Sequence, residues 1–264
     1  GSAPAVDFPT ALLTGLAPDG GLYLPERIPP VDLERLDRDD LAATATAVLA
    51  PYVDGCVGPT ELRALVADAL DFPIPLVRLD DDVSVLELFH GPTLAFKDVA
   101  ARTMARLMAR LRDRDRPLTV VVATSGDTGS AVAHAFWKVE GTRVVVLYPE
   151  GRVSPLQERQ FATLGHNVTA VAVDGSFDDC QRLAKNAFGD PQLTARHALT
   201  SANSINIGRL LPQVAYWVHA ATLLDADDPP PLWCVPSGNF GNLTAGLLAW
   251  RAGLPAAGFV AATN

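Results

Sequence analysis

The fold is decided by the stretch Val120-Val121-Val122-Ala123-Thr124-Ser125-Gly126-Asp127-Thr128-Gly129, which the Ala-rich segment 130–137 follows. Four apolar residues, three of them β-branched, predict a short buried strand, and the Ala-rich segment predicts a packed helix. A polar turn with two glycines joins the two. A strand that enters a helix in this way begins a βαβ unit, so the stretch predicts a parallel sheet.

The segments that follow repeat this alternation of strand and helix. Residues 144–148 and 168–173 are further apolar strand candidates. Between them, Ser154-Pro155-Leu156-Gln157 has the pattern of a capping box with proline at the first helical position. Residues 177–188 place their apolar side chains on one helical face, and Gly189 can end that helix. The chain therefore predicts an α/β fold with three layers, in which helices cover both faces of parallel sheets.

Elements are also expected outside this central part. Thr60 is a plausible N-cap for a helix, and residues 84–89 predict a strand. Residues 225–231, with three consecutive prolines, read as a linker. After it, residues 232–235 predict a strand, and a Gly-rich turn leads into an apolar helix from about Leu243.

Composition narrows the class of protein. The chain has 264 residues, 48% of them apolar, so it can bury a large core. Its net charge of -9, without a clustered basic stripe, argues against nucleic acid and favours a small-molecule partner. No apolar run is long enough for a membrane span, and no signal-peptide pattern opens the chain. The scattered Cys56, Cys180 and Cys234 suggest a reducing cytoplasm, and Cys234 is expected in the core.

Lysine is scarce, which narrows the search for a reactive amine. The chain has 21 basic residues, and only Lys97, Lys138 and Lys185 are lysines. Lys97 stands in His90-Gly91-Pro92-Thr93-Leu94-Ala95-Phe96-Lys97-Asp98, directly after two apolar residues. An amine held against an apolar wall is disfavoured in its charged form and becomes a nucleophile toward an aldehyde. The alternative is a surface lysine that pairs with Asp98.

Two segments have the features of anion sites at the start of a helix. Residues 124–129 follow a strand and offer hydroxyls and backbone N–H groups at a helix N-terminus. The same turn could belong to a dinucleotide site with Glu150 on the ribose, or it could bind nothing. Residues 237–242, Ser-Gly-Asn-Phe-Gly-Asn, form a second candidate phosphate cradle. This cradle lacks the lysine of a nucleoside-triphosphate loop.

A third segment combines an arginine with short polar side chains. In residues 203–209, Asn203 and Ser204 precede Arg209 at the start of an expected helix, and such donors suit a phosphate monoester. The alternative is a helix cap followed by a surface arginine. A reactive lysine together with several anion sites favours a phosphorylated aldehyde as cofactor. No metal site is expected, because metal-ligand spacing is absent among the five histidines, His90, His134, His166, His197 and His219.

These segments resemble those of a known family. Residues 90–98 resemble the cofactor-lysine segment of threonine synthases, and residues 11–25 resemble the N-terminal signature of their longer group. Residues 124–129, 203–213 and 235–242 resemble three more motifs of the family in the same order. The resemblance therefore extends over nearly the whole chain.

The resemblance implies the architecture of the fold-type-II pyridoxal-phosphate enzymes, similar to the tryptophan synthase beta subunit. On this basis, residues 1–95 are an N-terminal region that packs with the large domain, and residues 96–225 are a small α/β domain with the cofactor lysine at its start. Residues 226–264 would begin the large cofactor-binding domain. Longer-group enzymes usually continue well past this point, so we expect an incomplete large domain and an exposed sheet edge.

The resemblance also assigns roles to individual residues. It implies that Lys97 is the catalytic residue and binds pyridoxal 5'-phosphate covalently, while Asp127 faces the ring hydroxyl of the cofactor. The cofactor phosphate would be held by Gly238, Asn239, Phe240, Gly241 and Asn242. The substrate would be bound by Thr124, Ser125, Thr128, Asn203, Ser204 and Arg209.

The family reaction converts O-phospho-L-homoserine and water to L-threonine and phosphate. The resemblance thus implies a carbon–oxygen lyase of cytoplasmic threonine biosynthesis, either a monomer or a homodimer, without a nucleic-acid or membrane partner. One alternative is a related phospholyase that releases phosphate without forming threonine. Others are a non-catalytic remnant that binds the cofactor or phosphate, and a nicotinamide oxidoreductase suggested by Gly126, Gly129 and Glu150.

Overall fold

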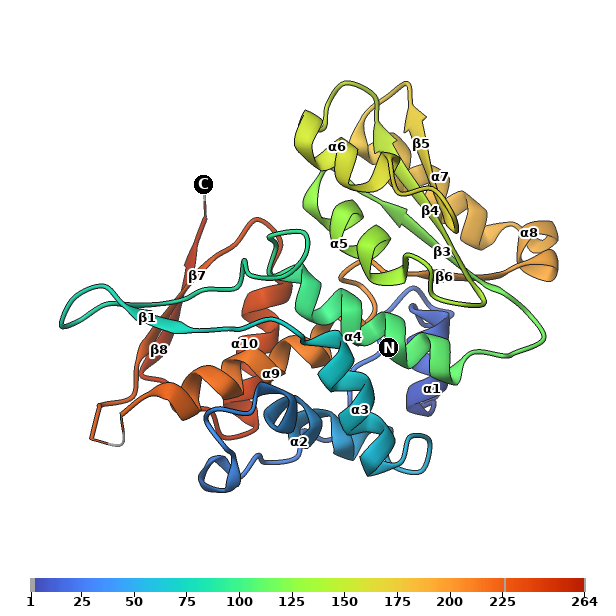
Figure 1. Cartoon of the computed structure of the whole chain (residues 1–264). Coiled ribbons are helices and arrows are strands. Elements are labelled where there is room, and N and C mark those ends of the chain that lie inside the picture. The colour runs from blue at the N-terminus through green and yellow to red at the C-terminus, as the bar shows by residue number, and fades with distance from the viewer. Residues whose placement is uncertain (1–2, 226, 264) are drawn as a thin grey trace.

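The computed structural model describes residues 3–225 and 227–263 and has two parts, a sheet with helices and a mostly helical part (Figure 1). The sheet has four parallel strands in the order β5-β4-β3-β6. Their bounds are Leu118–Ala123 for β3, Thr142–Pro149 for β4, Val168–Val173 for β5 and Ala198–Ser201 for β6. The prediction of a parallel sheet from the apolar runs is confirmed.

Helices cover both faces of this sheet, as predicted. Helices α5 (Asp127–Phe136) and α6 (Pro155–Ala162) pack on one face, and α7 (Phe177–Gly189) packs on the other. The alternation of side chains along β3 explains the layers. Val120 and Val122 belong to the main core, whereas Val121 and Ala123 pack with Cys180 and Ala184 of α7. A short helix, α8 (Pro191–Arg196), leads into β6.

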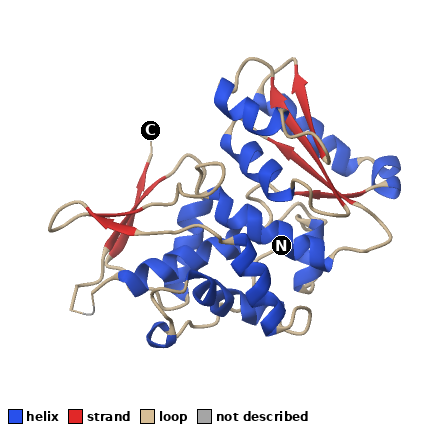
Figure 2. Cartoon of the chain, viewed as in Figure 1, coloured by secondary structure: helices blue, strands red, loops and turns tan. Residues whose placement is uncertain are grey.

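The second part is built around helix α9 (Ile207–Leu223), which packs against α2, α4 and α10. Figure 2 shows how helices dominate this part, with short strands at its left edge. Every residue from Ile207 to Ala220 is buried, so α9 is enclosed on all sides. The other helices of this part are α1 (Phe8–Thr14), η1 (Leu33–Arg35), α2 (Leu41–Val53), α3 (Pro59–Ala69), α4 (Lys97–Leu111) and α10 (Gly241–Arg251).

Two small sheets complete the fold. Strands β1 (Leu76–Arg78) and β2 (Ser84–Leu86) form an antiparallel hairpin. Strands β7 (Leu232–Pro236) and β8 (Gly258–Ala262) are parallel and are joined by α10. The strand and helix expected at 232–235 and near Leu243 are therefore present, although the helix begins two residues earlier. Within the described ranges, no helix combines the length and the hydropathy needed to cross a membrane.

Some local predictions were wrong. Gly58, not Thr60, is the N-cap of α3, because Pro59 fits the first helical position. The strand expected at 84–89 ends at Leu86, where its pairing with β1 also ends. Cys234 is exposed, since on β7 it alternates with the inward-facing Val235.

Helix α7 carries a capping interaction that gives a pH-dependent stability. The carboxylate of Asp179 accepts hydrogen bonds from the Ser176 amide and hydroxyl, at 2.7 and 2.8 Å, and pairs with Arg182. The backbone hydrogen bond is the largest cause that lowers the pKa of Asp179, from 3.8 to about 2. A lowered acid pKa stabilises the fold fully above pH 3.8, and this contribution is lost as the pH falls through 2.

The Asp179→Asn variant should therefore show a flatter pH dependence of the urea midpoint than the parent protein below pH 3.8. A parallel series of urea unfolding curves over that range would measure the difference. As a control, Asp178→Asn changes the neighbouring acidic residue, which is not one of the two residues that form the capping box. Equal slopes for Asp179→Asn and the parent would contradict the assignment.

Candidate active site

Lys97 is the first residue of α4, and its amine lies in a partly enclosed position. Nζ is 2.5 Å from Oδ2 of Asp127, which begins α5 in the other part of the molecule. The Lys97 side chain is 19% exposed, and its amine also lies over the Phe96 ring. The prediction of a shielded amine is confirmed. Its carboxylate partner is Asp127, so the alternative pairing with Asp98 is wrong.

Asp98 instead stabilises the loop that precedes Lys97. The side chain is buried and accepts hydrogen bonds from the Thr93 amide at 2.8 Å and the Thr93 hydroxyl at 2.6 Å. Gly91 lies so close that a Cβ there would be 2.5 Å from Oδ2 of Asp98. Leu94, between these contacts, has a positive φ of 60°, which is rare for a side chain of its type. The loop is thus held tightly up to Lys97.

The turn at 124–129 is shaped by the hydroxyl of Thr124. This buried hydroxyl accepts hydrogen bonds from the amides of Gly126 and Gly129, at 3.0 and 2.8 Å, and donates to the Gly126 carbonyl. A Cβ at Gly129 would lie 2.4 Å from Thr124 Cγ2, so the turn requires glycine there. Asp127 and Thr128 are half-buried, and Ser125 is exposed. Thr124 uses its donor and its acceptors inside the turn.

Arg209 is a buried cation that forms no ion pair with any carboxylate of the described residues. Its Nη1 donates to the Ala202 carbonyl at 2.6 Å, and its Nε has no hydrogen-bond partner among the described residues. No described carboxylate forms an ion pair with it within 4.0 Å, although Asp127 is near enough to favour its charged form. Burial lowers the pKa of Arg209 to about 10. The alternative of a surface arginine is wrong, and a bound anion would complete this arrangement.

The other residues of segment 203–209 connect Arg209 to its surroundings. Asn203 donates from Nδ2 to the carbonyl of Ala123 at 3.0 Å, at the end of β3. Asn206 caps α9 by accepting from the Gly208 amide. Ser204 is exposed. This segment therefore joins the end of the central strand to the beginning of α9.

The glycine turn 237–242 lies beside this segment. A Cβ on Gly241 would be 3.6 Å from Cβ of Ser204. Helix α10 begins at Gly241 without a side-chain cap, so backbone N–H groups of its first turn are available to an anion. Gly238, Asn239 and Phe240 are exposed, and Asn242 is half-buried.

Contacts thus connect all four predicted segments. Lys97 is hydrogen-bonded to Asp127 of the second segment, and Asn203 is hydrogen-bonded to the strand that precedes that segment. Ser204 lies next to Gly241 of the fourth segment. An amine, its carboxylate partner, a buried guanidinium and an uncapped helix N-terminus fit a phosphorylated aldehyde together with a phosphorylated substrate. The fit rests most directly on the buried Nε of Arg209, which lacks a partner among the described residues.

Sequence reasoning missed two polar residues next to the site. Gln213 and Tyr216 are buried in α9, and Tyr216 contacts Asn242 of the glycine turn. Both fall on the same helical face as Arg209, because Gln213 follows Arg209 by four residues and Tyr216 follows Gln213 by three. This helical spacing could have indicated a polar face on the helix. The apolar residues between these three positions instead favoured the interpretation of a helix buried in the core.

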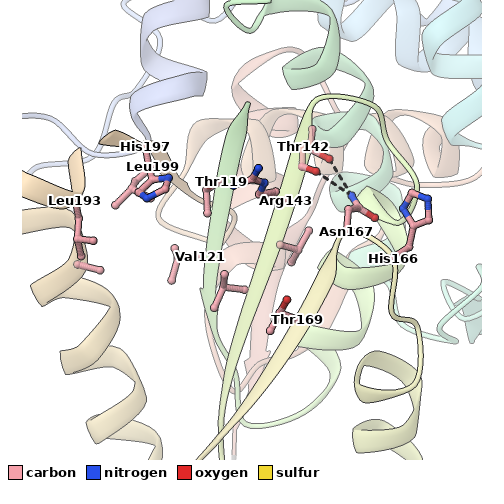
Figure 3. A pocket seen from close by; sticks show the side chains of 13 residues that line it. Thr119, Val121, Thr142, Arg143, His166, Asn167, Thr169, Leu193, His197 and Leu199 are labelled. Atoms are coloured by element: carbon pink, nitrogen blue, oxygen red, sulfur yellow. Dashed lines mark hydrogen bonds between the residues drawn. The ribbon is translucent and has the colours of Figure 1, made fainter. Parts of the chain in front are cut away.

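A separate hollow of about 740 Å3 lies on the face of the sheet near α7 and α8 (Figure 3). None of the predicted site residues lines this hollow. Several of its polar side chains, including Arg143, His166 and Thr169, are exposed to solvent. We therefore place the candidate chemistry at Lys97.

Comparison with known proteins identifies the family. Residues 58–264 match the family model described as pyridoxal-phosphate dependent enzyme. The chain belongs to the pyridoxal-phosphate dependent enzymes. Residues 1–70 of this pyridoxal-phosphate dependent enzyme also match the model described as threonine synthase N terminus. The cofactor prediction is confirmed at the level of the family, which favours it over the nicotinamide alternative.

The relatives of this pyridoxal-phosphate dependent enzyme include threonine synthases from several bacteria. The threonine synthase of Serratia marcescens is 48% identical over 98% of this chain, and that of Escherichia coli (strain K12) is 46% identical over 98%. In both comparisons the alignment covers 61% of the relative. The chain therefore spans about three fifths of the length of these relatives.

Solved structures agree with the fold. The crystal structure of threonine synthase from Escherichia coli matches with a TM-score of 0.90 and 45% identity, over 98% of this chain and 61% of that one. The structure of threonine synthase from Brucella melitensis with bound pyridoxal phosphate matches with a TM-score of 0.93 and 44% identity, over 100% and 59%. The predicted α/β architecture of fold type II is confirmed.

Proposed function

We propose that the protein is a threonine synthase that converts O-phospho-L-homoserine and water to L-threonine and phosphate. The observation that carries this proposal is the shielded Lys97 amine, 2.5 Å from Asp127, with the unneutralised Arg209 near the same carboxylate. This arrangement offers one group for an aldehyde and another for a phosphate. The similarity to threonine synthases supports the choice of substrate.

The residues that would hold the cofactor come from three segments. Lys97 would bind its aldehyde carbon, and Asp127 would accept a hydrogen bond from its ring hydroxyl. The turn from Gly238 to Asn242 would hold its phosphate with backbone N–H groups. When bound, pyridoxal phosphate supplies an electron sink that stabilises negative charge on the substrate carbon next to nitrogen.

The substrate would be held mainly by the segments that lie next to Lys97. Arg209 would bind its phosphate with Asn203 and Ser204, because a guanidinium with amide and hydroxyl donors suits a phosphate monoester. Ser125 and Thr128 would bind the amino-acid end from the exposed side of the turn. Thr124 would contribute through the shape of that turn, since its hydroxyl is used within it.

Lys97 would also move protons during the reaction. Formation of threonine removes phosphate from the γ carbon and adds water at the β carbon, so protons must leave and return at neighbouring carbons. The Lys97 amine is a suitable base and acid because it is shielded from bulk water and held beside Asp127.

Absorbance spectroscopy with the purified protein tests the cofactor site. We expect pyridoxal phosphate to give a visible absorption band with the parent protein, and Lys97→Ala to abolish it. Lys138→Ala is a matched control, because that lysine lies over the Trp137 ring, outside the proposed site. A band that persists in Lys97→Ala would reject the assignment.

Product analysis tests the reaction itself. With O-phospho-L-homoserine, we expect threonine and phosphate in equal amounts. Phosphate without threonine would support the phospholyase alternative, and neither product despite a cofactor band would support a non-catalytic binding role.

A further inference from the structure

Three buried or half-buried polar side chains link Arg209 to the glycine turn. Gln213 donates from Nε2 to the Arg209 carbonyl, and its Oε1 is 3.0 Å from the Tyr216 hydroxyl. The same hydroxyl is 2.7 Å from the terminal amide of Asn242, where Oδ1 is placed nearest. Gln213 and Tyr216 are almost completely buried, so water does not satisfy either of them.

The donors and acceptors of Gln213, Tyr216 and Asn242 determine the direction of each hydrogen bond. Burial raises the pKa of Tyr216 well above its usual value, so the hydroxyl keeps its single proton. That proton can be donated to only one of the two amides. The side-chain amide of Gln213 cannot be flipped, because its oxygen would then face the carbonyl oxygen of Arg209. Its Oε1 therefore needs the tyrosine proton.

Asn242 is free to take the other orientation. Oxygen and nitrogen of a terminal amide have nearly the same shape, so the hydrogen-bond network decides which faces a partner. Only Tyr216 is hydrogen-bonded to the Asn242 side chain among the described residues. The Trp217 indole N–H lies near the hydroxyl but forms no hydrogen bond by geometry. Both contacts of the Tyr216 hydroxyl pair one donor with one acceptor when Asn242 donates to Tyr216 and Tyr216 donates to Gln213.

We propose that Tyr216 is a positioning residue, which accepts a hydrogen bond from the side-chain amide of Asn242 and so holds the glycine turn with the Asn242 oxygen facing away from Tyr216. The consequence for the site rests on the proposed function. A side-chain oxygen repels a phosphate, so Asn242 holds the cofactor phosphate through its backbone N–H. Its side chain is hydrogen-bonded to Tyr216 of α9 and does not bind the phosphate.

A double-mutant cycle on stability tests the direction of this hydrogen bond without any ligand. The cycle compares the parent protein, Tyr216→Phe, Asn242→Asp and the double variant by urea unfolding at pH 7.5. The ionised carboxylate that Asn242→Asp introduces accepts hydrogen bonds but cannot donate them. If Asn242 donates, Asn242→Asp lowers the urea midpoint more in the parent protein than in the Tyr216→Phe variant. A smaller loss in the parent protein, or equal losses, overturns the proposal.

Cofactor titration then tests positioning. We expect Tyr216→Phe to weaken the binding of pyridoxal phosphate about ten-fold, as measured by the visible band, because the turn loses its anchor. Tyr148→Phe is the matched control, since that hydroxyl bonds Glu158 in the sheet part. After Asn242→Ala, Tyr216→Phe should have no further effect on the dissociation constant. Losses that multiply would indicate a general structural role and overturn positioning.

The two measurements separate this inference from the proposed function. If the parent protein shows no cofactor band, the proposed function fails, and the stability cycle still decides the orientation of Asn242. If the band is present and the cycle shows no coupling, only the role of Tyr216 fails.

Discussion

Replacing Arg209 by methionine is expected to lower kcat/KM for O-phospho-L-homoserine by about 10²- to 10⁴-fold, without making the ligand-free protein less stable. Two charge-assisted hydrogen bonds to a phosphate are worth about 1.5–3 kcal/mol each, and each 1.4 kcal/mol is about ten-fold in rate. Phosphate release kinetics and urea unfolding would measure the two effects. Activity and stability respond differently because Arg209 is a buried cation that has no carboxylate partner among the described residues.

The stability of the ligand-free Arg209→Met variant depends on the burial of Arg209. Arg209 is desolvated, and its Nε lacks a partner in the described part of the chain. Methionine has a similar length and no charge to bury, and such replacements are often neutral or stabilising. Arg143→Met, on an exposed arginine of β4, is the control for the loss of a positive charge. Unchanged kinetics in Arg209→Met would remove Arg209 from the substrate site.

Replacing Asp98 by alanine is expected to lower the free energy of unfolding by about 2–4 kcal/mol, because two buried donors lose their acceptor. These donors are the amide and the hydroxyl of Thr93. Urea unfolding would measure the loss. We also expect a weaker cofactor band, since the loop that positions Lys97 would be released.

Asp68→Ala is the appropriate control for this second variant. Asp68 pairs with Arg106, but its side chain is 68% exposed. An exposed ion pair contributes less than about 1 kcal/mol, so the control should unfold close to the parent. If Asp98→Ala behaved in the same way, the view of Asp98 as the residue that folds the loop would be wrong.

The sheet was predictable because most of its strands have a clear local pattern. β3, β4 and β5 are rich in apolar β-branched residues, above all at 120–122 and 144–146, and β3 is buried along its whole length between the helices of the two faces. β6 was not predicted, because Ala198–Ser201 is short and half polar. Its place at the edge of the sheet comes from pairing with β3, a contact between residues about 80 positions apart.

The site was predictable in its residue types and less so in its pairings. Lys97 could be recognised by its apolar neighbours, but the nearest acid in the sequence, Asp98, is not its partner. Asp127 is 30 residues away and reaches Lys97 only because α4 and α5 pack together. The burial of Arg209 likewise depends on the helices around α9, which no local pattern reveals.

The enclosure of α9 has a consequence for how the protein fluctuates. Backbone amides exchange with solvent deuterium when a segment opens, and the most enclosed segments usually open last. The amides of α9 should therefore be among the slowest to exchange, whether or not small molecules are present. Arg209 and Tyr216 are both carried by this helix, so the side chains that we assign to binding and positioning are anchored in the part of the chain that opens least.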